Sequence, residues 1–107
     1  MFSNEDTSLL RSAQIALLGE VTPRLRSVSF DRKGEYDMLH ARFVFDGEPT
    51  EDERDSASCV MGEVLSHFSR NHIDYREEFV ACPRPRKIEN LRLLAYLRNE
   101  EPWTVWA

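Results

Sequence analysis

The spacing of apolar residues changes once in the middle of the chain, and this change constrains the fold most. From Leu39 to Phe45 every second residue is apolar, as in a strand with one buried face. From Thr50 onward the apolar residues recur at helical spacing. Thr50 and Glu53 have the spacing of a capping box, in which each side chain bonds the free backbone N–H of the other. The sequence therefore predicts a strand over 35–45 and a helix over 50–68. The apolar residues concerned are Leu39, Ala41, Phe43 and Phe45 in the strand, and Ala57, Val60, Met61, Val64, Leu65 and Phe68 in the helix.

The remaining segments complete the order αββαββ. A first helix is predicted over 6–18, capped by Asn4 or Asp6 and ended by Gly19. Strands are predicted over 25–31, 74–82 and 91–98, with a hairpin turn over 31–34. This pattern predicts an α+β fold, a four-stranded antiparallel sheet with two helices packed on one face.

The sequence also makes specific predictions for Arg26 in the first strand and Gly62 in the second helix. Alternation along the strand over 25–31 places Arg26 on the same face as Val28 and Phe30. Gly62 lies inside the second helix, where glycine is unfavourable by ~1 kcal/mol relative to alanine. A close approach of the helix to the sheet would explain it.

Length and composition predict one domain over residues 1–107, with residues 99–107 as a C-terminal tail. Trp103 and Trp106 in this tail are expected to fold back onto the sheet or the first helix, and the alternative is an anchor for a partner. No apolar run is long enough to span a membrane, and the acidic start MFSNEDTS is unlike a secretory signal. These features predict a cytoplasmic protein without membrane contact, in which Cys59 and Cys82 are reduced.

The sequence carries no motif for catalysis, a cofactor or a metal. Its four glycines are scattered, and no CxxC or HxxxH spacing occurs. We therefore predict no enzyme and no cofactor, and we expect both cysteines to be small packing residues. The alternative is a small enzyme or ligand-binding domain that uses a thiol or one of the histidines. The histidines are His40, His67 and His72.

The charge is negative overall and unevenly placed. The net charge of −5 argues against nucleic acid as a partner. Six carboxylates and one arginine lie between Asp46 and Asp55. Five bases against one acid lie over 83–98, so the molecule is expected to be electrically two-sided unless the fold interleaves these segments.

Two interpretations of the acidic run remain open. Carboxylates in the first turn of a helix stabilise it by ~0.3–1 kcal/mol each, which accounts for Glu51, Asp52 and Glu53. The surplus acids favour a surface that attracts a basic protein. The expected partner-binding residues are Asp46, Glu48, Glu51, Asp52 and Asp55, with Glu35 and Asp37 as outliers. The basic segment over 84–87 is the rival face and would suit an acidic partner.

Three stretches carry a resemblance to a known group of proteins. They are LLGEVTPRLRSVSF, ARFVFDGEPTEDERDSASCVMGEVLSHF and LLAYLRNE. Together they resemble small bacterial immunity proteins of contact-dependent growth inhibition systems, over roughly residues 9–100. The resemblance implies a cytosolic protein that binds and blocks one toxin domain, commonly a nuclease. It carries over no site residue, because immunity proteins share no residue motif.

Overall fold

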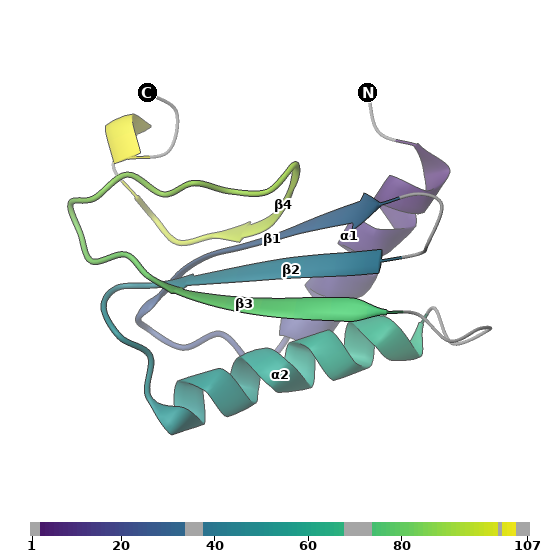
Figure 1. Cartoon of the computed structure of the whole chain (residues 1–107), viewed down its shortest axis with the longest axis horizontal. Coiled ribbons are helices and arrows are strands. Elements are labelled where there is room, and N and C mark those ends of the chain that lie inside the picture. Colours follow the sequence, from purple (N-terminus) through teal and green to yellow (C-terminus); the bar gives the residue numbers. More distant parts are fainter. Residues whose placement is uncertain (1–2, 34–37, 68–73, 101, 105–107) are drawn as a thin grey trace.

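Two helices and a four-stranded mixed sheet form an α+β fold in the computed structural model (Figure 1). The structure describes residues 3–33, 38–67, 74–100 and 102–104. The elements are α1 (Asn4–Leu17), β1 (Leu25–Lys33), β2 (Met38–Phe45), α2 (Glu51–Ser66), β3 (Tyr75–Ala81), β4 (Leu93–Leu97) and the short 3₁₀ helix η2 (Pro102–Thr104).

Both helices begin with a capping box. The backbone N–H of Glu53 donates to the Thr50 hydroxyl at 3.2 Å, and the Thr50 N–H donates to the Glu53 carboxylate at 2.8 Å. The capping box predicted for α2 is therefore confirmed. In α1 the cap is Ser3, not Asn4 or Asp6, and Asp6 supplies the returning carboxylate. The helix consequently begins two residues earlier than the sequence predicts.

The strand order is β3-β2-β1-β4, and one pairing differs from the prediction. β1 runs antiparallel to both β2 and β4, but β2 and β3 are parallel. The prediction of a wholly antiparallel sheet is therefore wrong. The physical reason is α2, which crosses over between β2 and β3 and returns the chain to the same end of the sheet (Figure 1). A strand–helix–strand order is typical of such a parallel unit.

β1 also extends beyond its predicted end. Arg32 pairs with Leu39, and Lys33 pairs with Met38. The residues expected to begin a hairpin turn at Asp31 are therefore part of the strand, and residues 34–37 lie outside the described residues.

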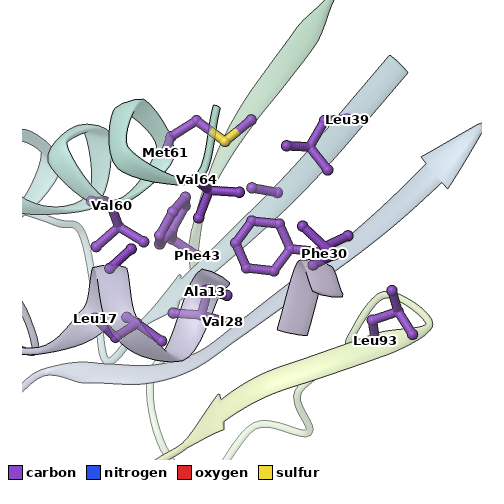
Figure 2. Packing of buried hydrophobic residues seen from close by; sticks show 14 of the residues in the cluster. Ala13, Leu17, Val28, Phe30, Leu39, Phe43, Val60, Met61, Val64 and Leu93 are labelled. Carbon is purple, nitrogen blue, oxygen red and sulfur yellow. The ribbon is translucent and has the colours of Figure 1, made fainter. Parts of the chain in front are cut away.

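Side chains from α1, α2, β1, β2 and β4 meet in one buried cluster (Figure 2). The alternation predicted for β2 is confirmed, because its four alternate apolar residues are all buried. The stripe predicted for α2 is buried from Ala57 to Val64, with Leu65 partly buried, and Phe68 lies outside the described residues. Gly62 does not face this cluster. It is exposed, and a Cβ atom added there would meet nothing within 4 Å, so the expected approach to the sheet is wrong.

Two register shifts change which way the side chains of β1 and β4 face. One lies between Leu25 and Ser27 in the β1–β2 pair, and the other lies between Val28 and Ser29 in the β1–β4 pair. The extra residue of a bulge disturbs strict alternation. The prediction that Arg26 shares a face with Val28 is therefore wrong. Arg26 contacts the segment over 82–100, as Ser27 and Ser29 also do.

The C-terminal tail returns to the body of the molecule through Thr104. Thr104 is fully buried, and its carbonyl accepts the Ile88 N–H at 2.8 Å. Trp103, which was expected to dock, is 53% exposed, and Trp106 lies outside the described residues. Ile88 itself belongs to a smaller buried cluster with Val44 and Cys82.

Candidate protein-binding surface

Two carboxylates of the acidic run over 46–55, the predicted binding residue Asp46 and the capping residue Glu53, are engaged within the molecule. Asp46 accepts the Arg84 backbone N–H at 3.0 Å and pairs with Arg98 at 3.1 Å, and these contacts lower the pKa of Asp46. Glu53 receives two hydrogen bonds from Arg24, at 2.7 and 3.1 Å. Those bonds, with the capping contact to Thr50, lower the pKa of Glu53 to about 2. Both carboxylates have a structural role.

Glu48 has a weaker internal contact. It pairs with Arg54 at 2.9 Å, and the two side chains are 75% and 44% exposed. An ion pair this exposed contributes only ~0–1 kcal/mol and breaks readily. Glu48 is thus available to a partner, although its charge is partly offset.

Glu51, Asp52 and Asp55 are the acidic residues that stay open. All three are exposed on α2, and none forms an ion pair or a side-chain hydrogen bond with another residue in the described ranges. Residues three and four apart are neighbours on a helix surface, so Asp55 lies beside Glu51 and Asp52. Glu35 and Asp37, the predicted outliers, lie outside the described residues.

The same side of α2 continues past Asp55 to Cys59 and Gly62, four and seven residues further on, and both are exposed. Cys59 was expected to pack inside, and that expectation is wrong because the buried stripe passes on the other side of the helix. We call the set Glu51, Asp52, Asp55, Cys59 and Gly62 the outer face of α2. It combines three open carboxylates with two small residues, and sequence reasoning identified only the carboxylates.

The fold interleaves the acidic and basic segments that the sequence separates. Arg98 pairs with Asp46, while Arg92 binds Asp6 through two bonds of 2.9 Å and reaches Asp31 at 3.2 Å. Hydrogen bonds from Arg92 hold the pKa of Asp6 well below its usual range. Arg92 and Arg98 of the basic stretch over 83–98 are therefore neutralised internally, which makes the molecule less two-sided in charge than the sequence predicts. Arg84, Arg86 and Lys87 of the rival face are exposed.

A cleft of about 420 Å³ is lined by residues of β2, β3 and the segment that follows β3. Its lining includes Arg42, Val44, Glu78, Val80, Cys82 and Arg86. A pocket of converging polar groups is what the small-enzyme alternative requires. Here the polar groups bind one another, since both Arg42 and His40 contact Glu78 at 2.9 Å. Burial raises the pKa of Glu78, but its bonds to Arg42 and His40 outweigh that effect, so the pKa is lowered overall.

The thiols and the remaining histidines do not form a catalytic pair in the described parts of the chain. Cys82 is buried, as expected, and its Sγ lies 3.5 Å from both an Arg26 nitrogen and the Lys87 carbonyl oxygen. His67 is exposed at the end of α2, and His72 lies outside the described residues. Across the described ranges no three His, Cys, Asp or Glu side chains are placed to hold a metal ion.

The helices give no sign of a membrane span. Within the ranges that the structure describes, neither is long and apolar enough to cross a bilayer.

Comparison with known proteins identifies the family. A search of curated proteins finds no match to the sequence. A family model described as MafI2 immunity protein matches residues 6–100, a range that includes all four strands, α2 and most of α1. Maf is a polymorphic toxin system akin to contact-dependent growth inhibition, so the resemblance to toxin-immunity proteins is confirmed. The chain belongs to the MafI2 immunity protein family.

Proposed function

We propose that this protein binds and neutralises a basic toxin domain through the open carboxylates of α2. Membership of an immunity family supports a protein toxin as the partner. The observation that carries the proposal is the state of Glu51, Asp52 and Asp55, which are exposed and have no ion-pair partner among the described residues. Inhibition then needs binding alone and no catalytic step by this chain.

The negative charge of these carboxylates provides a reason why they would attract a basic partner. Opposite charges on two proteins steer their encounter and raise the association rate, and salt screens this attraction. Asp46 and Glu53 contribute little to it, because arginines of the chain itself already neutralise them. The attraction therefore comes from the outer face of α2, with Glu48 beside it.

A nuclease is the toxin class that fits this surface best. Its cleft must carry positive charge to hold phosphates, since the phosphate backbone supplies most of the affinity for nucleic acid. Carboxylates that lie where phosphates would bind can block such a cleft. The proposal places this encounter in the cytosol, where such a toxin would reach nucleic acid.

Charge reversal tests the proposal. A toxin domain of the Maf system, carrying an inactivating substitution, is used as the probe in surface plasmon resonance. Asp52→Lys with Asp55→Lys should lower the association rate constant about tenfold or more in low salt and flatten its dependence on salt. Glu5→Lys with Glu89→Lys is a control with the same change of charge, because both residues are exposed and neither lies on α2.

A variant of the basic segment over 84–87, the rival face, tests the opposite interpretation. Arg84→Glu with Arg86→Glu reverses two charges of the basic segment, which is also exposed. If that variant slows association while the α2 variant associates at the wild-type rate, the acidic face is the wrong surface and the partner is acidic.

A further inference from the structure

Large apolar side chains are exposed together at the end of α1. Of the five that are exposed in the described residues, three lie within one stretch of seven residues: Ile15 is 47% exposed, Leu18 is 78% exposed and Val21 is 41% exposed. Isolated apolar residues on a surface need no explanation, but a group of them marks an interaction site. We call these three residues the α1-end patch.

The local backbone brings the patch together. The Leu18 N–H donates to the Ile15 carbonyl at 3.2 Å, so the two residues lie one turn apart on the same side. Leu17, between them, points the other way and is buried. Gly19 then turns the chain with a φ of +81°, which other residues rarely adopt, and Val21 follows two residues later.

Two sets of contacts hold the segment that carries this patch against α2, one near Val60 and the other at the acidic first turn. The two helices lie side by side, and Leu17 of α1 and Val60 of α2 belong to the same buried cluster (Figure 2). Arg24, three residues after Val21, holds Glu53 in the first turn of α2 and also binds the Glu48 carbonyl at 2.6 Å. The chain that carries the patch is thereby fixed against the turn that carries the open carboxylates.

We infer that the α1-end patch is the apolar part of the toxin-binding surface, and that it receives an apolar side chain of the toxin domain. This inference rests on the proposed function. Protein interfaces commonly combine an apolar centre with a charged rim, and a few apolar contacts supply most of the affinity. Here Glu20 within the patch segment and Glu51 and Asp52 nearby would form the rim on this protein's side.

The net charge of the chain favours a basic protein over a second copy of the chain as the molecule that binds the α1-end patch. A second copy of this chain also carries a net charge of −5, so pairing two patches would bring like charges together. A basic partner has no such penalty. In a complex with a basic toxin domain, the carboxylates and the patch should affect different rate constants. Charges mainly set the association rate constant, and buried apolar contacts mainly set the dissociation rate constant.

Replacing the most exposed residue of the patch tests the inference. Leu18→Ser should raise the dissociation rate constant of the complex with the inactivated toxin domain about tenfold and leave the association rate constant and its salt dependence unchanged. Because Leu18 is 78% exposed, the substitution should not unfold the protein, and urea denaturation checks this. Tyr75→Ser is the matched control, since Tyr75 is 54% exposed outside the patch.

Three outcomes would overturn the inference. If Leu18→Ser leaves the dissociation rate unchanged while the α2 charge variants still slow association, the patch is not part of the surface but the proposed function stands. If the wild-type protein does not bind the toxin domain at all, the proposed function itself fails. If analytical ultracentrifugation shows a wild-type dimer that Leu18→Ser converts to a monomer, the patch joins two copies of the chain instead.

Discussion

Arg26 and Glu100 form an ion pair in which neither side chain has any exposed surface. Two hydrogen bonds, of 2.8 and 3.1 Å, join the guanidinium to the carboxylate. The remaining Arg26 nitrogen donates to the carbonyls of Cys82 and Arg86. Burial opposes the charge of Glu100, but Arg26 and Arg98 outweigh it, so the pKa of Glu100 is lowered. This pair fastens the chain after β4 to the start of β1.

Removing the carboxylate of this pair should be strongly destabilising. Glu100→Gln leaves the Arg26 charge buried without its partner, and we expect the free energy of unfolding to fall by about 3–5 kcal/mol. Urea denaturation at neutral pH measures it. The double variant Arg26→Met with Glu100→Leu should lose less than Glu100→Gln alone, because no charge is then left buried. A double variant less stable than Glu100→Gln would contradict this account.

Acid should weaken the protein partly through Glu53. Its pKa falls from an ordinary value of 4.5 to about 2 in the folded state, so the unfolded chain binds the proton more tightly. The stabilisation is therefore complete above pH 4.5 and is lost as the pH falls towards 2. Glu53→Gln should be less stable than wild type at pH 7 and should lose less stability between pH 5 and pH 3.

A neighbouring residue serves as the control for that experiment. Glu51→Gln removes an exposed carboxylate from the same helical turn, one that has no ion pair among the described residues. Urea denaturation at several pH values compares how the free energy of unfolding of this variant, of Glu53→Gln and of wild type changes with pH. An equal change of this pH dependence in both variants would mean that the bonds from Arg24 do not cause the effect of Glu53.

Gly62→Ala should change stability and toxin binding in opposite directions. Alanine is favoured over glycine by ~1 kcal/mol in an exposed helix interior, and the added Cβ meets nothing within 4 Å. The free energy of unfolding should therefore rise by about that amount. Under the proposed function the same Cβ projects toward the toxin, so affinity should fall. Unchanged affinity would place Gly62 outside the contact. Thermal denaturation and surface plasmon resonance provide the two measurements.

The two thiols should differ in reactivity. Cys59 is exposed and Cys82 is buried, and both are free. A thiol reagent such as 5,5′-dithiobis(2-nitrobenzoic acid) should modify Cys59 rapidly in the native protein and Cys82 only after denaturation. Cys59→Ser should abolish the rapid phase. Since Cys59 lies on the outer face of α2, adding the inactivated toxin domain should slow the rapid phase, and an unchanged rate would argue against that face.

Local signals in the sequence predicted the elements but not how all of them pair. The contact between Thr50 and Glu53 and the buried residues of β2 follow from spacing alone, because capping and alternation act between near neighbours. The direction of β3 does not follow from its own residues, since a strand has the same alternation whether its neighbour is parallel or antiparallel. The order β2–α2–β3 was the signal that favoured a parallel pair.

Single residues of the candidate site were also only partly predictable from the sequence. Its carboxylates could be found from composition, but which of them remain open depends on arginines distant in sequence. Asp46 is 52 residues from Arg98, and Glu53 is 29 residues from Arg24. The bulge beside Arg26 also redirects a side chain that alternation had placed on the other face. Such long-range pairs depend on the register of the sheet, which one sequence does not reveal.

The position of α2 within a crossover has a consequence for how new specificities arise. The helix is joined to strands on both sides, its inward residues are held by the buried cluster, and its first turn is held by Arg24. Substitutions at exposed positions such as Asp52, Asp55 or Cys59 remove none of these contacts. An immunity protein built this way can exchange its outward residues to follow a changing toxin while the folding of the chain stays almost untouched.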